Sequence, residues 1–172
     1  KLHHIDISAY SDRETRSILE AVIKVSGKKI SVFGNHWPSQ GNVDECRIEA
    51  SKVLKREALT STSDAVIALG DFNTSHDDLL NGITVNIDPY FINVEEKAKK
   101  LKTNLNEGTH WYRGTWDSLD KIFVLKKSLK KISVDYSSFE IVKRDFMLTE
   151  KAWTNYETGE TAIHQIPLRY DI

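Results

Sequence analysis

Residues 66–79, VIALGDFNTSHDDL, join an apolar segment to a polar end. The apolar run stops at Gly70 and is followed at once by Asp71, Phe72 and Asn73. Almost no polar residue interrupts the run, which is typical of a strand buried on both faces. Alternate residues of an extended segment point the same way, so Asp71 and Asn73 are expected to face one pocket while Phe72 packs oppositely.

The segments before this strand predict a sheet covered by a helix. Residues 18–25, ILEAVIKV, and the strand that starts at Lys29 and ends at His36 flank a short Ser-Gly turn, which predicts a β-hairpin. Residues 43–59 place Cys46 and other apolar side chains on one face, which predicts an amphipathic helix.

The segments after the strand complete an α/β pattern. We expect a short helix, an irregular loop and a second helical segment over residues 77–108, and strands at 119–125 and 139–143. Residues 149–165 are rich in turn formers and show no clear period. Strand, helix and strand in alternation predict layers of helix on sheet, with the chemistry at the strand ends.

Composition fits one soluble domain spanning residues 1–172. The chain is 40% hydrophobic and 28% charged, and domains of about 100–150 residues are common. Its 24 basic and 25 acidic side chains leave a net charge of −1, so an anionic partner has to be held locally. The one cysteine, Cys46, excludes an internal disulfide, and no apolar run approaches the length of a membrane span.

The polar residues at two strand ends are candidates for phosphate chemistry. Asp71 can orient water or help to hold a hard cation such as Mg²⁺, and the Asn73 amide can donate to an anion. An Asx turn after the strand explains the same residues equally well. His36 ends a neighbouring strand and can donate a proton to a phosphoryl oxygen, although a lone histidine there is more often structural.

A third candidate is the aromatic segment at residues 108–124. Arg113 and Trp116 can grip and stack on a phosphorylated ligand, or the segment can be a rim of core aromatics. Asp120 follows at the start of the next strand, where an acid commonly orients a histidine.

Three motifs in this order resemble the endonuclease/exonuclease/phosphatase superfamily, which has the deoxyribonuclease-I-like fold. They are RSILEAVIKVSGKKISVFGNHWPS, VIALGDFN and YRGTWDSLDKIFV, and the match covers about residues 13–125. The resemblance implies a four-layer α/β sandwich of two facing mixed sheets flanked by helices. It also implies hydrolysis of phosphoester bonds with Mg²⁺ or Mn²⁺.

The resemblance also assigns roles to single residues. His36 matches the histidine that contacts the phosphate, and Asn73 matches the amide that grips it. Asp71 matches the acid that orients the attacking water or lies in the metal site. Asp120 matches the acid that orients a final catalytic histidine. The substrate implied is a phosphoester in a nucleic acid, a nucleotide, a lipid or a sugar head group.

Two motifs of the superfamily have no counterpart in the sequence. Nothing before Arg13 supplies the Asn-bearing and Glu-bearing strands, and no Ser-Asp-His motif appears, because Ile163 stands where the acid would precede His164. We therefore expect a partial domain that has little or no hydrolytic activity by itself, with an exposed sheet edge or face.

Two alternative functions remain open. A non-catalytic binding or scaffold module would keep the fold without a complete metal site. A histidine-based metallohydrolase is the weaker alternative, since the histidines show neither HExxH spacing nor a cysteine partner.

Overall fold

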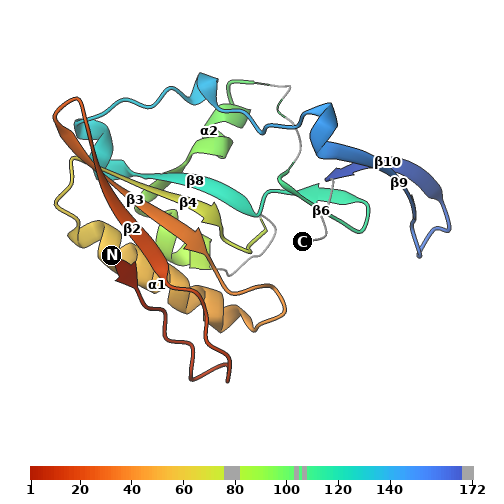
Figure 1. Cartoon of the computed structure of the whole chain (residues 1–172), viewed down its shortest axis with the longest axis horizontal. Coiled ribbons are helices and arrows are strands. Elements are labelled where there is room, and N and C mark those ends of the chain that lie inside the picture. The colour runs from red at the N-terminus through yellow and green to blue at the C-terminus, as the bar shows by residue number, and fades with distance from the viewer. Residues whose placement is uncertain (76–81, 103–104, 106–107, 168–172) are drawn as a thin grey trace.

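The computed structural model describes residues 1–75, 82–102, 105 and 108–167. Its main element is a six-stranded sheet in the order β1-β2-β3-β4-β8-β5 (Figure 1). Strands β3 and β4 are parallel, and the other neighbours are antiparallel. The strands of this sheet are β1 (Leu2–His3), β2 (Ile18–Val25), β3 (Lys28–His36), β4 (Ala65–Asp71), β5 (Phe91–Asn93) and β8 (Asp120–Leu125).

The predicted hairpin and amphipathic helix are both confirmed. Ser26 and Gly27 turn β2 into β3 with φ of 49° and 79°, as a tight hairpin requires. Helix α1 (Asp44–Thr60) buries Cys46 and Leu54 completely against the sheet.

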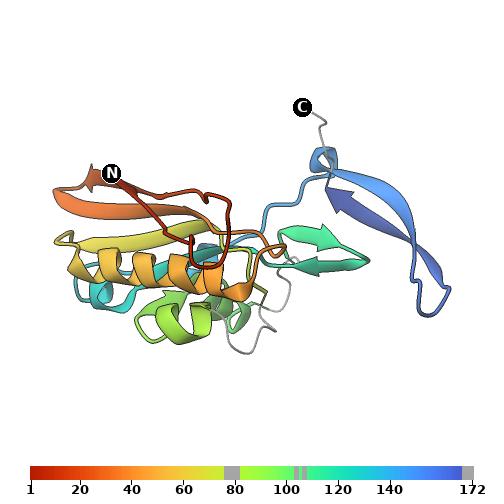
Figure 2. The ribbon, with the colours of Figure 1, turned by 90° about the horizontal axis from the view of Figure 1, so that it is seen from below.

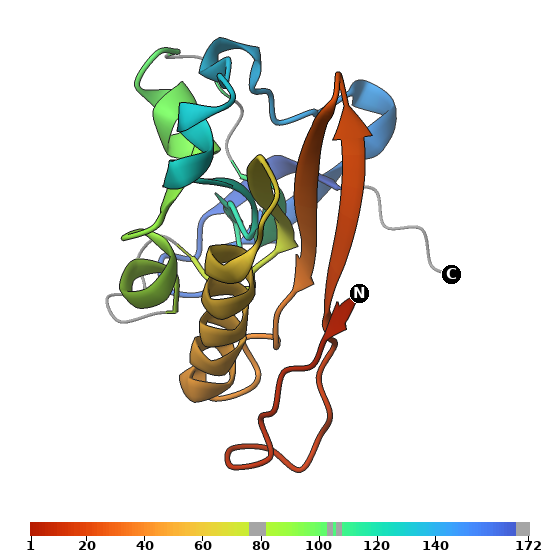
Figure 3. The same cartoon turned by 90° about the vertical axis from the view of Figure 1, so that its left-hand side faces the viewer.

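Helices α1 and α2 (Val94–Lys99) lie on the same face of the sheet (Figures 2 and 3). The alternation of side chains along the strands explains this arrangement. Phe33, Ala68 and Phe123 form one register row, are fully buried and belong to the hydrophobic core with α1. The next row along the strands contains Leu69 and Ile122, which point to the opposite face and are 39% and 37% exposed.

The structure of residues 82–102 agrees in part with what the sequence predicted. The short helix expected from about Asp77 lies partly outside the described residues, and the described part continues as a π-helix, Ile83–Ile87. The second helical segment is confirmed as α2, whose N-cap Asn93 accepts hydrogen bonds from the Glu95 and Glu96 backbone. Strand β5 was not predicted, because its three residues are too few to show a period.

The strand predicted at residues 139–143 is wrong. Within the part of the chain that the structure describes, this segment pairs with none of the strands, although Ile141 is 6% exposed and the apolar pattern resembles that of a strand. It crosses the open face of the sheet between two short 3-10 helices, Tyr136–Ser138 and Asp145–Met147.

The turn-rich segment at residues 149–165 forms an unpredicted hairpin. Strands β9 (Leu148–Thr154) and β10 (Thr161–Pro167) pair along their whole length and extend away from the large sheet (Figure 1). Most of their side chains are exposed on both faces, so the sequence shows no alternation. Strands β6 (His110–Tyr112) and β7 (Thr115–Asp117) form a second small hairpin.

The α/β class is confirmed by this mixed sheet and its helices. Within the described residues, the expected second sheet is represented by two two-stranded hairpins rather than by a large facing sheet. In the same part of the chain, none of the helices has the length and apolar character needed to span a membrane.

Candidate active site

His36, Asp71 and Asp120 form one row across three neighbouring strands. His36 is the register partner of Asp71 on β3 and β4, and Asp71 is the partner of Asp120 on β4 and β8. Each of the three lies two positions along its own strand from the row that contains Leu69 and Ile122. Residues two apart in a strand point the same way, so all three side chains point to the face opposite α1. The structure therefore brings together three residues that were singled out separately.

The histidine and the central carboxylate are close enough to interact. Nε2 of His36 lies 3.7 Å from Oδ2 of Asp71, and the side chains are 48% and 31% exposed. The two groups form an ion pair when the imidazole is protonated, and both remain accessible to a ligand from solvent.

Asn73 holds the Asp71 carboxylate through a turn. The Asn73 backbone N–H donates to Oδ1 of Asp71 at 2.7 Å, and its Nδ2 donates to Oδ2 at 3.3 Å and to the Trp37 carbonyl at 2.9 Å. Asn73 has φ of 47°, so the expected extended geometry does not continue past Asp71. The Asx turn considered as an alternative is present, and it fixes the carboxylate in place.

An aromatic layer lies beneath the row, on the side of the helices. The rings of Trp37 and Phe72 pack edge to face at 4.8 Å, those of Phe72 and Phe123 at 5.1 Å, and all three side chains are fully buried. The backbone N–H of Trp37 donates to the backbone carbonyl of Asp71 at 2.9 Å, and the backbone N–H of Phe72 donates to the backbone carbonyl of Leu119 at 3.0 Å. These contacts fix the register in which the three polar side chains meet.

Gly70 permits the close approach of β3 and β4 just before the row. Its φ is 123°, and a Cβ atom at this position would lie 2.1 Å from the Asn35 carbonyl oxygen. No other residue type fits there without displacing the strand that carries His36.

A buried polar network supports the segment that leads into Asp120. Ser118 Oγ donates to Glu95 at 2.7 Å, and the Lys121 amine donates to the Ser118 carbonyl. Burial lowers the pKa of the Lys121 amine below its ordinary value of 10.5, and the Glu95 and Asp117 carboxylates act in the opposite direction. Thr109 accepts the Asp120 N–H through Oγ1 at 3.2 Å.

Sequence reasoning missed these supporting residues. The signal that could have found them is Lys121, because the alternation of β8 demands a buried side chain there and a buried lysine needs polar partners.

The two predicted substrate-binding residues lie apart from each other. Trp116 lines the same cavity as Asp120, with the Lys143 amine 3.3 Å from the centre of its ring. Arg113 lies in the turn of the β6–β7 hairpin over the Tyr112 ring and borders a hollow with Trp153. The structure brings Trp116 toward the row, and it does not bring Arg113 there.

The two carboxylates of the row provide some, but not all, of the ligands that a hard cation needs. Asp71 and Asp120 are like charges on directly opposed residues, an arrangement that is unfavourable unless a positive charge lies nearby. Carboxylate oxygens are the ligands that Mg²⁺ prefers. Within the described residues, however, no group of three or more His, Cys, Asp or Glu side chains could hold a metal.

Comparison with known families identifies the relatives of this chain. Residues 3–169 match the Endonuclease/Exonuclease/phosphatase family. The chain belongs to that family. No protein in a search of curated sequences matches it.

Solved structures with the same fold share little sequence with the chain. TDP2 from D. rerio complexed with a single strand DNA product is 17% identical, with a TM-score of 0.53, and the match covers 73% of this chain and 51% of that chain. Truncated TDP2 from Caenorhabditis elegans is 12% identical, with a TM-score of 0.52 and coverage of 73% and 50%. A beta toxin mutant from Staphylococcus aureus with bound magnesium ions is 17% identical, with a TM-score of 0.49 and coverage of 86% and 52%.

The chain spans about half the length of these solved structures. At such identities the likeness to the two TDP2 structures shows the fold alone, which is the deoxyribonuclease-I-like fold that the sequence motifs predicted.

Proposed function

We propose that the protein is a metal-dependent phosphoesterase whose site is the row of His36, Asp71 and Asp120. The observation that carries the proposal is the register of β3, β4 and β8, which places an imidazole and two carboxylates side by side on one open face. Membership of a family of phosphoric ester hydrolases supports the reaction class.

Each residue of the row has a role that its contacts support. Asp71 orients the water that forms the new P–O bond while the ester P–O bond breaks in line with it. His36, 3.7 Å from Asp71, donates a hydrogen bond to a phosphoryl oxygen. Asn73 keeps the Asp71 carboxylate in its orientation, and its amide nitrogen also donates to the Trp37 carbonyl.

Mg²⁺ or Mn²⁺ would be held through Asp71, with Asp120 as the neighbouring carboxylate. The ion would supply positive charge that offsets the charge of the phosphate oxygens and of the transition state. The two carboxylates are a partial ligand set, so the affinity of the described residues alone for the ion is expected to be weak.

The substrate is a phosphoester, and nucleic acid is one of its possible forms. A net charge of −1 provides no general attraction to polyanions, so binding would depend on the local site. One structure of the same fold carries a single strand DNA product, which supports including DNA among the substrates tested.

A non-catalytic binding module is the second candidate. It is favoured by one observation, the lack of a cluster of three metal-ligating side chains in the part of the chain that the structure describes. Such a module would bind a phosphate group at the row without hydrolysing it.

The test is hydrolysis by the protein as its gene encodes it, with bis-p-nitrophenyl phosphate and single-stranded DNA as substrates. We expect turnover that requires Mg²⁺ or Mn²⁺ and falls by about 100-fold or more in His36→Ala and Asp71→Ala. The control is Asp12→Ala, in an exposed loop. Turnover that is unchanged in Asp71→Ala contradicts the proposal, and phosphate binding without turnover supports the binding module.

A further inference from the structure

Six exposed lysines lie at the end of the large sheet where β3 begins and where β2 and β8 end. Three belong to the β2–β3 hairpin, and three belong to the 3-10 helix Lys126–Lys130 and the residue after it. We call this set the lysine patch, and its members are Lys24, Lys28, Lys29, Lys127, Lys130 and Lys131.

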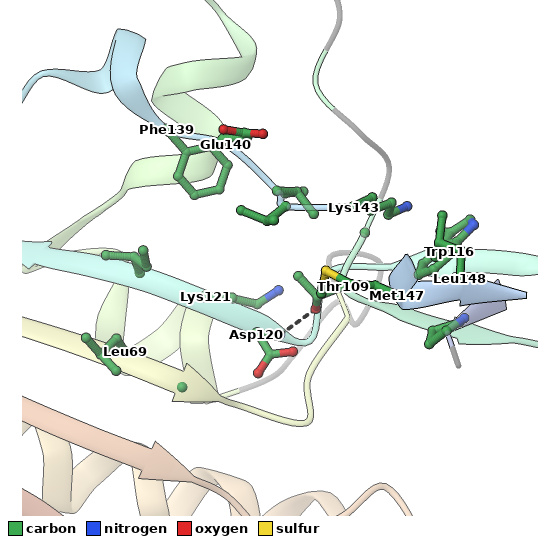
Figure 4. Close-up of a pocket in the computed structure, with 16 residues that line it drawn as sticks. Leu69, Thr109, Trp116, Asp120, Lys121, Phe139, Glu140, Lys143, Met147 and Leu148 are labelled. Atoms are coloured by element: carbon green, nitrogen blue, oxygen red, sulfur yellow. Dashed lines mark hydrogen bonds between the residues drawn. The ribbon is translucent and has the colours of Figure 1, made fainter. Parts of the chain in front are cut away.

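The lysine patch and the proposed catalytic row lie at opposite ends of the strands. Lys28 and His36 are the first and last residues of β3, so the two sites are about 26 Å apart along this strand. The patch is at the left-hand end of the sheet in Figure 1, whereas Figure 4 shows Asp120 at the start of β8, where the row lies.

Hydrogen bonds join the segments that carry the patch. The Lys28 amine donates to the Lys131 carbonyl. The Lys127 amine donates to the carbonyls of Leu59 at 2.9 Å and Ser61 at 3.2 Å, at the C-terminal end of α1. A carbonyl oxygen carries no net charge, so these contacts position the ammonium groups without neutralising them.

The carboxylates near the patch are fewer than its lysines. Asp64 accepts the amine of one of the six at 2.8 Å. Lys29 borders a hollow that Glu20 and Glu57 also line, but both of these carboxylates contact the His3 ring, at 3.0 Å and 3.2 Å. Among the described residues, most of the positive charge of the patch is therefore not compensated.

The chemistry of the patch indicates a surface that faces solvent. Burying six ammonium groups beneath another protein layer would be costly without matching acids. Lys24 and Lys29 are directly opposed register partners, an arrangement that is unfavourable unless an anion lies nearby. A partner with many negative charges would relieve this repulsion.

Aliphatic side chains are exposed among the lysines. Val25 is the register partner of Lys28, Leu129 follows Lys127 in the 3-10 helix, and the carbonyl of Leu59 accepts the Lys127 amine. These three apolar side chains are 50%, 38% and 38% exposed. They have no ring on which a nucleic acid base could stack, but lysines with aliphatic groups between them suit the interface of an anionic bilayer.

We propose that the lysine patch binds the surface of an anionic lipid bilayer. The ammonium groups contact the negatively charged head groups, and Val25 and Leu129 enter the interface between them. This inference goes beyond the proposed function and does not depend on it. Because the row lies at the other end of the strands, it remains open to solvent while the patch is bound.

The test is sedimentation of the protein as its gene encodes it with vesicles of phosphatidylcholine, with or without phosphatidylserine. We expect binding that requires phosphatidylserine and weakens as the salt concentration rises. Vesicles that contain phosphatidylserine and bind no protein would overturn the inference. So would equal binding to both kinds of vesicle.

A double variant, Lys24→Gln with Lys130→Gln, removes charge from the patch without breaking its internal contacts. Among the described residues, neither side chain takes part in a hydrogen bond or ion pair. We expect binding to phosphatidylserine vesicles to fall roughly 25-fold, about fivefold for each lysine. Urea unfolding shows whether the variant keeps the stability of the wild type.

The matched control is Lys97→Gln with Lys100→Gln, which removes the same charge from exposed positions on and just after α2. It should leave vesicle binding unchanged, and an equal loss in both double variants would overturn the assignment to the patch. Binding of double-stranded DNA that the patch variant weakens, without vesicle binding, would assign the patch to nucleic acid instead. Absence of hydrolysis overturns the proposed function and leaves this inference in force.

Discussion

Asp71 and Asp120 are directly opposed residues of two antiparallel strands, and both carboxyl groups lie on the open face of the sheet. Their repulsion predicts that Asp120→Asn raises the free energy of unfolding by about 0.2–1 kcal/mol in the presence of EDTA. Mg²⁺ should stabilise the wild type more than it stabilises the variant. Urea unfolding with and without Mg²⁺ measures both effects.

The control for this prediction is Asp12→Asn, which removes an exposed carboxylate far along the chain from the row. It should change neither the stability in EDTA nor the response to Mg²⁺. Equal responses to Mg²⁺ in the wild type and Asp120→Asn would show that the opposed carboxylates do not attract a cation.

Gly70→Ala should destabilise the protein by at least about 2 kcal/mol, because a left-handed φ and a close contact with the Asn35 carbonyl oxygen both oppose a Cβ atom. Gly41→Ala is the matched control, since its nearest contact, Ser39 Oγ at 3.8 Å, is an ordinary one. Urea unfolding of the two variants measures the difference. Similar small effects at both glycines would mean that β3 and β4 can separate without cost at this point.

The stability of the protein should fall in acid partly through Glu20. Burial raises the pKa of this carboxyl group, but hydrogen bonds from His3 and Ser31 outweigh burial and lower it below its ordinary value of 4.5. A lowered pKa in the folded state contributes stability that is present above about pH 4.5 and is lost as the pH falls through the folded value.

Glu20→Gln should therefore reduce the dependence of the unfolding free energy on pH below about 4.5. Unfolding by urea between pH 3 and pH 7 measures this dependence, and Glu14→Gln, at an exposed position, is the control. If Glu20→Gln retains the slope of the wild type, other carboxylates account for the acid sensitivity.

Sequence reasoning succeeded where strands and helices carry strong local patterns. The apolar run ending at Gly70 and the hairpin around Gly27 predicted β2, β3 and β4, and the amphipathic period predicted α1. The sequence predicted that the strands ending at His36 and Asp71 are neighbours, but it did not predict that these two residues are register partners. The exact pairing depends on contacts between residues far apart in the chain.

The failures have physical causes that a local pattern cannot show. Residues 139–143 have the composition of a strand, but they pair with none of the strands among the described residues, and Ile141 lines the cavity over the sheet instead. The β9–β10 hairpin is stabilised by its own ladder while most of its side chains face solvent, so its residues need not alternate. The network of Ser118 and Lys121 joins separate segments through buried hydrogen bonds.

The most direct test of the account is the position at which a divalent cation binds. Substoichiometric Mn²⁺ is added to ¹⁵N-labelled protein, and paramagnetic broadening of the backbone amide signals is recorded for the wild type and Asp71→Ala. The account predicts that broadening centres on His36, Asp71 and Asp120 and disappears in Asp71→Ala. Broadening that centres elsewhere on the protein, or that persists unchanged in Asp71→Ala, would contradict it.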